Sequence, residues 1–391
     1  MDPYANEWLD LLVRWLHVVA AIAWIGSSFY FIALDNHLRP PKDEADADAG
    51  VGGESWEIHG GGFYQVQKYT LAPKTLPEPL HWFKWEAYTT WLSGFALLIV
   101  LYYVNADTYL IDKSVADLEP WEAIAISVGL LVAAWLMYDG LCRVIPNDLI
   151  IGAALLVLVT LAAWGVSHLF SGRAEYIQIG AMLGTIMAAN VFFVIIPAHW
   201  DLIRAKEAGR EPNAAAALEA KRRSVHNNYL TLPVVFTMIS NHFPITYGHS
   251  YSWLILVCLL VIGAWVRHFF NVRHTGRTAW WVPVTAAAGI AAVAVAIRPG
   301  GSTGGTAVPF TRAQAIVQER CVPCHSAHPT KVNSAPMGLV FDTPRQIAAQ
   351  ARLIEQVAVN TKVMPLGNQT GMTQAERDTL GAWIRQGAKT R

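Results

Sequence analysis

The chain has 391 residues, of which 53% are hydrophobic and only 15% are charged. This balance is far from that of an ordinary soluble domain and close to that of a polytopic membrane protein. Lys and Arg number 29, and Asp and Glu also number 29, so the net charge is zero and nucleic-acid binding has no electrostatic support.

Eight apolar stretches approach the ~20 residues that cross a ~30 Å hydrocarbon core as a helix. No basic region precedes the first, so we expect a spanning helix there rather than a cleaved signal peptide. Lys and Arg gather in the connections after the first, third, fifth and seventh stretches, which places both termini outside. The stretches are approximately 8–34, 86–104, 120–141, 149–170, 175–198, 228–246, 250–270 and 279–297.

Two connections on the inner side are long. In the first, residues 42–55 are rich in Asp, Ala and Gly and are expected to be flexible, whereas the aromatic density of residues 56–85 predicts a packed structure that covers or lines a site. In the second, the Ala-rich run 214–220 predicts a short helix that ends in the triplet 221–223 of one Lys and two Arg. We expect these cations to be solvated near lipid headgroups, with anion attraction as the alternative.

Small residues recur every four positions in the fifth stretch, at Gly180, Gly184 and Ala188, which is typical of close helix packing. Asn190 is expected to form interhelical hydrogen bonds. Ionisable and amide side chains gather near both ends of the predicted bundle, where they are functional candidates. Those near the inner side are Asp35, His37, His81, Glu86, Asp139, Arg143, His199, Asp201, His226, Arg267, His268 and His274, and those in the outer half are Arg14, His17, His168, His242 and His249.

Cys321-Val322-Pro323-Cys324-His325 has the C-x-x-C-H pattern by which c-type haem is attached, with the thiols bonded to the porphyrin and the imidazole on the iron. A zinc site would require a further thiol or histidine pair, and no cysteine follows Cys324. The other two cysteines, Cys142 and Cys258, lie in apolar runs and are expected to be unpaired thiols. The sequence therefore predicts haem c near the C-terminus.

The haem region is expected to be a separate domain, residues 310–391, after a Gly-rich linker at 299–309. Thr311 with Gln314, and Thr373 with Glu376, predict capping boxes at two of its helices. Met364, before Pro365, is the favoured second axial ligand, and the competitors are Met337 and Met372. Trp383 is expected to pack against the porphyrin or the first helix of this domain. The predicted fold is all-α, with an eight-helix transmembrane bundle (1–298) followed by a small class I cytochrome c.

The order of parts and five segments resemble the membrane-bound bacterial urate hydroxylases, also called urate oxidases. The resemblance implies oxidation of urate to 5-hydroxyisourate in purine breakdown, in the bacterial inner membrane with the cytochrome on the periplasmic side. The segments are 56–64 (WEIHGGGFY), 82–86 (WFKWE), 226–229 (HNNY), 240–242 (SNH) and 267–274 (RHFFNVRH).

The first stretch separately resembles membrane haem or copper proteins, because His17 stands seven residues before Trp24-Ile25-Gly26. It makes His17 a candidate ligand of a b-type haem, with His242 as its partner. Such a haem would relay electrons across the bundle. If urate instead enters an outer cavity, the same two histidines could hydrogen-bond the purine.

Oxidation of urate by water requires a base and donors that hold negative charge on the ring. The expected acceptor of the electrons is a respiratory-chain component, such as a cytochrome c or a terminal oxidase, reached through haem c. Two alternatives stay open: a non-catalytic conduit from quinol to a periplasmic acceptor, and a haem- or copper-handling membrane protein. The candidate catalytic residues are Lys68, His59, Glu86, His226 and His268, and the candidate substrate donors are Asn227 and Arg267.

Overall fold

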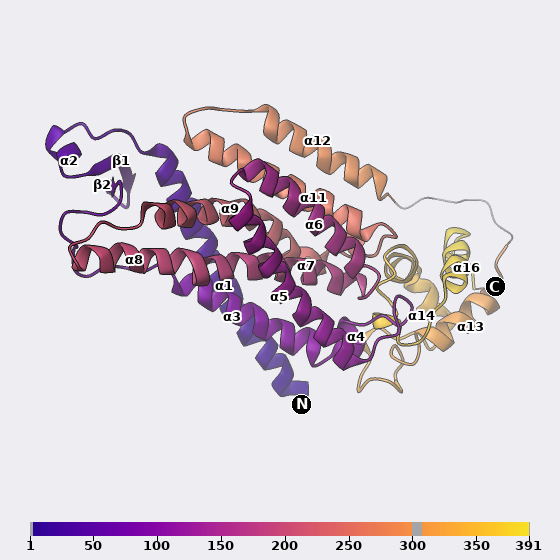
Figure 1. Ribbon diagram of the computed structural model, residues 1–391. Coiled ribbons are helices and arrows are strands. Elements are labelled where there is room, and N and C mark those ends of the chain that lie inside the picture. The colour runs from indigo at the N-terminus through magenta and orange to yellow at the C-terminus, as the bar shows by residue number, and fades with distance from the viewer. Residues whose placement is uncertain (1–2, 299–306, 391) are drawn as a thin grey trace.

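The computed structural model describes residues 3–298 and 307–390. These residues are mainly helical and form an elongated helical bundle with a smaller C-terminal domain at one end (Figure 1). Residues 299–306, most of the predicted linker, lie outside the described part of the chain. We call the end of the bundle that carries the C-terminal domain the α4 end, after the short helix α4 (Ala106–Tyr109) that lies there.

Each of the eight predicted stretches falls on a helical segment of the bundle. Two of the segments contain a π-helical turn: η1 (Leu98–Tyr103) extends α3, and η2 (Val191–Ile195) joins α7 to α8. The helices are α1 (Pro3–His37), α3 (Trp85–Leu97), α5 (Pro120–Val144), α6 (Asp148–Val166), α7 (Gly172–Asn190), α8 (Ile196–Glu207), α9 (Ala214–Ile239), α11 (Ser252–His274) and α12 (Trp281–Ala296).

Within the described residues, five helical runs are long and apolar enough to cross a membrane: α1, α5, α6, α7 with α8, and α11. The apolar helix α12 is shorter. Trp15 and Ile22 on α1 are each 67% exposed, as expected of side chains that face lipid rather than protein. The structure is therefore compatible with a membrane protein.

Helix α7 is the most enclosed of these runs and packs against α5 and α9. The predicted small-residue packing is confirmed at Gly180, where a Cβ atom would lie 2.0 Å from the Thr237 hydroxyl of α9. Gly184 has no neighbour that a Cβ atom would contact. Close approach thus concentrates at one residue, and it holds α9 against the centre of the bundle.

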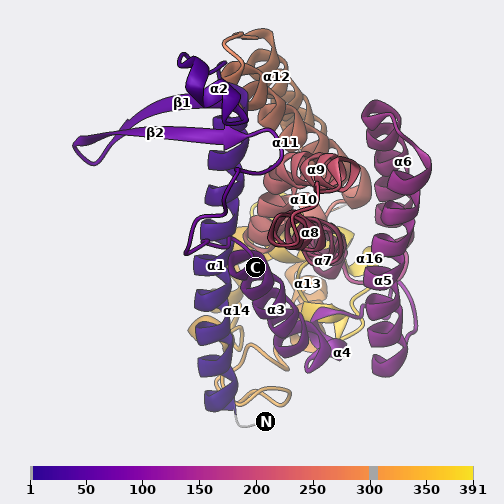
Figure 2. The ribbon, with the colours of Figure 1, turned by 60° about the vertical axis from the view of Figure 1, so that its left-hand side comes forward.

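The all-α prediction is wrong only for residues 51–69, which form a hairpin of β1 (Val51–His59) and β2 (Gly62–Tyr69) after the short helix α2 (Glu44–Asp48). Gly60 and Gly61 both have positive φ, as a tight two-residue hairpin turn requires. The hairpin projects sideways from α1 (Figure 2), and Phe63 near its turn is 77% exposed. This part of the aromatic segment therefore extends away from the bundle.

The short helix predicted at 214–220 is instead the first part of α9, which is 26 residues long and contains Pro233. Lys221 is exposed, as expected, but the interpretation of the whole triplet as solvated is wrong. Arg223 is only 2% exposed, because carboxylates from its own helix and from α5 neutralise it inside the bundle. Three consecutive cations on a helix point in three directions, and one of them points inward.

The C-terminal domain has a core of its own, built around Val317, Leu380 and Trp383. The capping box of Thr373 and Glu376 is confirmed, whereas Thr311 caps nothing because its helix begins earlier, at Phe310. Trp383 packs against Phe310 of the domain's first helix, with 5.6 Å between ring centroids. The helical elements are α13 (Phe310–Arg320), η4 (Pro336–Gly338), α14 (Pro344–Ala349), α15 (Ala351–Ile354), η5 (Glu355–Asn360), η6 (Leu366–Asn368) and α16 (Gln374–Arg385).

Candidate functional site

Two consecutive residues of α9, Asn227 and Asn228, separate two buried polar clusters. The Asn227 amide donates to the Met187 carbonyl of α7 at 2.9 Å, and its oxygen accepts from Asn190 at 2.8 Å. The Asn228 oxygen accepts from Arg267 of α11. Successive helical residues point about 100° apart, so one asparagine serves each side. We call the two sides the Arg223 cluster (α5, α7 and α9) and the Arg267 cluster (α1, α9 and α11).

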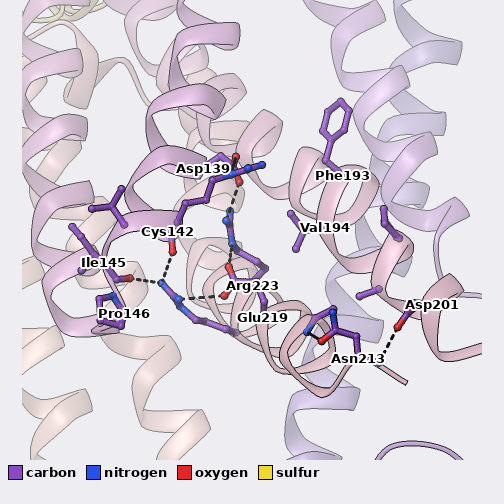
Figure 3. Close-up of a pocket in the computed structure, with 16 residues that line it drawn as sticks. Asp139, Cys142, Ile145, Pro146, Phe193, Val194, Asp201, Asn213, Glu219 and Arg223 are labelled. Carbon is purple, nitrogen blue, oxygen red and sulfur yellow. Dashed lines mark hydrogen bonds and ion pairs between the residues drawn. The ribbon is translucent and has the colours of Figure 1, made fainter. Parts of the chain in front are cut away.

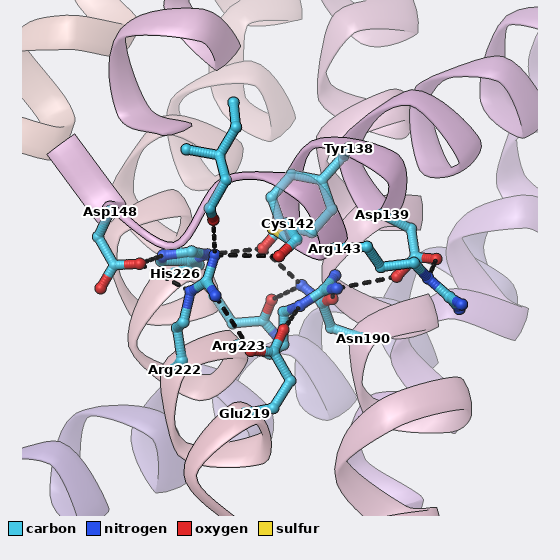
Figure 4. Close-up of polar contacts among 12 residues, drawn as sticks. Tyr138, Asp139, Cys142, Arg143, Asp148, Asn190, Glu219, Arg222, Arg223 and His226 are labelled. Atoms are coloured by element: carbon cyan, nitrogen blue, oxygen red, sulfur yellow. Dashed lines mark hydrogen bonds and ion pairs between the residues drawn. The ribbon is translucent and has the colours of Figure 1, made fainter. Parts of the chain in front are cut away.

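The charge of Arg223 is fully matched (Figure 4). Its guanidinium lies 2.9 Å from a carboxylate oxygen of Asp139 and 2.6 Å from one of Glu219, and it also donates to the Asn190 oxygen at 3.0 Å. Asn190 is thus the interhelical hydrogen bonder that the sequence predicts. Because two carboxylates face this cation, the cluster can hold α5, α7 and α9 together without a ligand.

His226 lies beside this network (Figure 4). Its Nδ1 is 2.8 Å from the Tyr138 hydroxyl. Its Nε2 is 3.3 Å from Asp148 but makes no hydrogen bond, because the two groups are not aligned. Asp148 is instead bonded to Arg222 at 2.7 Å. His226 therefore has one fixed ring nitrogen and one that could take or give a proton.

A cavity of about 800 Å³ opens next to Arg223 and is shown in Figure 3. Asp139, Glu219 and Arg223 contribute polar groups to its wall, and Phe193 and Val194 contribute apolar surface. The arginines of this wall, Arg143 included, already have carboxylate partners. The cavity therefore has space for a ligand but offers no unmatched positive charge.

The Arg267 cluster differs in this respect. Arg267 is also 2% exposed, but no carboxylate among the described residues forms an ion pair with it. Its Nε donates to Asn228 at 2.8 Å, its guanidinium lies 3.7 Å from the centre of the Phe29 ring, and its Nη2 has no partner. Asn271 donates to the same Asn228 oxygen at 3.0 Å, and its own oxygen has no partner. The cluster thus presents an unpaired donor and an unpaired acceptor.

Two histidines of α11, His268 and His274, are close in sequence to Arg267 and Asn271. His268 lies 2.8 Å from the Tyr229 hydroxyl and stacks on Trp265 at 5.3 Å between ring centroids. His274 packs edge-on against His37 of α1. The prediction that Arg267, Asn271 and His274 share a helix face agrees with their contacts to Asn228 and α1. His268, one residue from Arg267, points to a different neighbour.

The remaining candidate bases lie elsewhere. Lys68 is half-exposed and pairs with Asp35 at 2.6 Å, which ties the hairpin to α1. His59 is exposed at the hairpin turn. Glu86 stands in the first turn of α3, and one of its carboxylate oxygens is buried without a partner. No hydrogen bond or ion pair of the described residues joins these three to His226 or His268.

His17 is held at one ring nitrogen by groups of α3. Its Nδ1 is 3.0 Å from the Thr90 carbonyl and 3.1 Å from the Ser93 hydroxyl, so Nε2 is the nitrogen left for coordination. A Cβ atom at Gly94 would lie 2.9 Å from the ring, so only glycine fits there. His242 is exposed in η3 (Ser240–His242), and no hydrogen bond or ring contact of the described residues joins it to His17.

The C-x-x-C-H site of the C-terminal domain fits a c-type haem. The Nδ1 of His325 is 3.1 Å from the Leu339 carbonyl, which leaves Nε2 for iron. Burial raises the pKa of the Cys321 thiol to about 12. Met364 packs against the same core as Cys321. Of its competitors, Met337 is 94% exposed and Met372 is buried in that core.

A family model described as "Urate oxidase N-terminal" matches residues 3–298. The chain belongs to this urate oxidase family. No curated protein and no solved structure matches the chain. The family match covers the whole bundle, including both polar clusters and the hairpin, and it stops before the C-terminal domain. Membership associates the bundle with the oxidation of urate.

Three residues that complete the Arg267 cluster were not among the predicted site residues: Asn228, Asn271 and Phe29. Asn228 and Asn271 lie within the segments that carry the resemblance, and their amides next to apolar residues are a usable signal. Phe29 gives no signal, because an aromatic residue in an apolar stretch looks like any other lipid-facing or core side chain. Only the packing of α1 on α11 brings it to Arg267.

Proposed function

We propose that the bundle oxidises urate to 5-hydroxyisourate and that the electrons leave through the C-terminal domain. In this reaction urate and one water give 5-hydroxyisourate, two protons and two electrons. The observation that carries the proposal is the buried, unmatched charge of Arg267. Burying a cation without an anion costs several kcal/mol, so a site of this kind favours an anionic ligand. Urate is an anion near neutral pH.

The groups beside Arg267 suit a flat heterocycle that carries carbonyl and N–H groups on its rim. The free Nη2 of Arg267 can donate to a ring oxygen or a deprotonated nitrogen, and the free oxygen of Asn271 can accept from a ring N–H. Asn228 holds both side chains through one oxygen atom. The side chains of Arg267 and Asn271 are therefore fixed before the substrate binds, which lowers the entropy lost on binding.

A base must take protons from urate or from the attacking water. Of the predicted candidates, we propose His268, which is adjacent to Arg267 in α11 and is oriented by the Tyr229 hydroxyl. His226 is oriented in the same way by Tyr138, but it lies beside the Arg223 cluster. Glu86 follows, with its unpaired buried oxygen. Asn227 already uses both ends of its amide, in hydrogen bonds with Met187 and Asn190, so its role would be to position other residues. Lys68 and His59 belong to the hairpin, which Lys68 ties to α1.

A haem held by Cys321, Cys324, His325 and Met364 would supply a one-electron acceptor, so the two electrons would leave in succession to a respiratory-chain acceptor. Arg267 contacts Phe29, which is twelve residues from His17 along α1, or about 18 Å at 1.5 Å per residue. His17 therefore lies between the Arg267 cluster and the α4 end. This position supports a b-type haem at His17, with His242 as the proposed second ligand. The proposed location is the bacterial inner membrane, with both termini and the C-terminal domain outside.

The test is to add urate to the purified, oxidised protein without oxygen and to record the haem c absorption. Reduction of the haem with formation of 5-hydroxyisourate is the expected result. Arg267→Met should abolish reduction by urate, while Arg273→Met, an exposed arginine on the same helix, should not. Reduction by a quinol but not by urate would contradict the proposal and favour an electron conduit.

A further inference from the structure

The C-terminal domain contacts the α4 end of the bundle through one short stretch, residues 361–369, which we call the docking segment. Gln369 donates to the hydroxyl of Thr108 in α4 (Ala106–Tyr109) at 2.8 Å. Val363 packs against the hydrophobic core of the bundle. Met364, the proposed iron ligand, is the next residue. The stretch that presents sulfur to the haem is therefore also the stretch that touches the bundle.

Two glycines, one on each side of the contact, show how close the two parts lie. A Cβ atom at Gly248, which follows α10 (Pro244–Tyr247), would lie 1.8 Å from the Thr361 carbonyl oxygen. A Cβ atom at Gly367 would lie 2.9 Å from the carbonyl oxygens of Asp107 and Thr108. Backbone meets backbone at both places, so the contact depends on the absence of side chains.

The docking segment is braced from inside its own domain. Arg377 is 5% exposed and donates to the carbonyl oxygens of Met364 and Ala358, the first at 2.6 Å. The carboxylate of Asp112, in the connection that follows α4, acts favourably on the Arg377 charge across the contact. Shape and charge thus both match the docking segment to the α4 end.

We propose that the C-terminal domain works while docked through residues 361–369, so that electrons from the bundle enter it on the Met364 side. The source of the electrons rests on the proposed function, whereas the docking itself does not. Tyr109 of α4 and the buried Tyr102 lie behind the contact, with ring centroids 6.3 Å apart. The partner of this surface is therefore the bundle of the same chain, and an external acceptor must bind another face of the domain.

Cross-linking tests the docking without urate. In a full-length variant with Cys142→Ser and Cys258→Ser, the pair Thr108→Cys and Gln369→Cys should form a disulfide under mild oxidation. The control pair, Thr108→Cys and Lys389→Cys, should not, since Lys389 is close to the C-terminus on the far side of the domain (Figure 1). Equal yields from the two pairs, or none from the first, would overturn the docking.

The cross-linked protein then shows whether the docked state is the working state. Urate should reduce its haem as fast as that of the same protein after the disulfide has been opened with dithiothreitol, the thiols alkylated, the reductant removed and the haem reoxidised. A rate that is lost on cross-linking and restored on opening would mean that the domain must move, and would refute the proposal. If urate reduces neither form, the proposed function fails, and the cross-linking yields alone decide the docking.

A glycine comparison gives a second, independent measurement. Gly367 and Gly371 have similar positive φ angles, 57° and 65°, so alanine strains the backbone equally at both. Only at Gly367 does the new Cβ atom meet the bundle, because the atom nearest to Gly371 is 4.0 Å away. Gly367→Ala should therefore lower the Thr108–Gln369 cross-link yield severalfold and leave the haem absorption spectrum unchanged. Gly371→Ala should preserve the yield, and equal losses in the two variants would overturn the proposal.

Discussion

Arg223 and Arg267 belong to two clusters on different faces of α9 and are both 2% exposed, but among the described residues only Arg223 has carboxylate partners. Arg223 faces two carboxylates and an amide oxygen, whereas Arg267 faces an amide oxygen and an aromatic ring and keeps one nitrogen free. A buried cation with matched anions stabilises the fold it bridges, and one without them destabilises the fold until an anion arrives. Burial without a partner, rather than burial alone, is therefore the ground on which we propose Arg267 as a binding residue.

The largest effect that this comparison predicts concerns Arg223. Arg223→Met leaves the buried Asp139 with only the exposed Arg143 and the partly buried Glu219 with only Arg222, so the free energy of unfolding should fall by about 3 kcal/mol. Arg143, an exposed partner of the same Asp139, is the control, and Arg143→Met should cost less than about 1 kcal/mol. Denaturant unfolding in detergent measures both. Equal losses would show that Arg223 has no special structural role.

Arg267→Met should have the opposite effect on stability. Removing an unmatched buried charge should raise the free energy of unfolding by about 1 kcal/mol or more. Urate affinity should fall by about 3 kcal/mol, or roughly a hundredfold in Kd. Calorimetric titration with urate gives the affinity, and Arg273→Met should change neither quantity. Loss of stability without loss of urate binding would make Arg267 a structural residue like Arg223.

Asn271→Leu gives a smaller, purely local effect. The substitution keeps the volume but removes the free acceptor, so urate affinity should fall by about 1 kcal/mol, or roughly fivefold. Asn36→Leu is the matched control, because Asn36 contacts only the backbone carbonyl of Asn271. If the two variants bind urate equally well, the free oxygen of Asn271 does not contact the substrate.

The smallest effect concerns the carboxylate of Asp342, which has hydrogen-bond partners at the exposed surface rather than inside the bundle. Asp342 is exposed in the C-terminal domain, and hydrogen bonds from the Ala327 N–H and the Ser326 side chain lower the pKa of its carboxyl group. A lowered folded-state pKa contributes stability above the unfolded value of about 3.9, and this contribution is lost as pH falls through the folded value.

Asp342→Asn should therefore lose less stability than the parent protein as the pH falls below about 4. Thermal unfolding of the full-length protein, followed by haem absorption, measures this difference. Identical pH profiles would mean that the two hydrogen bonds do not distinguish the charged carboxylate from the neutral acid.

Sequence reasoning locates the helices well, because apolar length is a property of consecutive residues. The eight predicted stretches all fall on helical segments, and the capping box at Thr373 depends on only four neighbouring residues. The hairpin is not predicted, because the Gly60-Gly61 turn lies in a segment whose Trp, Tyr and Phe content favours a packed structure over a projecting one. Reading the alternation of residues on either side of that turn would have favoured strands.

The site is less predictable, because it depends on which helix faces meet. Sequence alone selects Arg267 and Asn227 equally as substrate donors, yet the structure leaves a free nitrogen on Arg267 and none on Asn227. The partner of Arg223 is Asp139, which is 84 positions earlier in the chain. No local pattern encodes such a pairing. The C-x-x-C-H pattern, in contrast, predicts haem attachment from adjacent residues alone and depends on no pairing of helix faces.

The side-by-side arrangement of Asn227 and Asn228 makes α9 sensitive to its residue count at this point. Inserting one residue ahead of this pair would turn both side chains by about 100°, so that each would face the neighbours of another helix face. Arg267 would lose its hydrogen bond to the Asn228 oxygen, and Asn190 would lose its hydrogen bond to the Asn227 oxygen. Homologous bundles can therefore vary in the length of their loops, but we expect the spacing between 219 and 228 in α9 to tolerate no insertion or deletion.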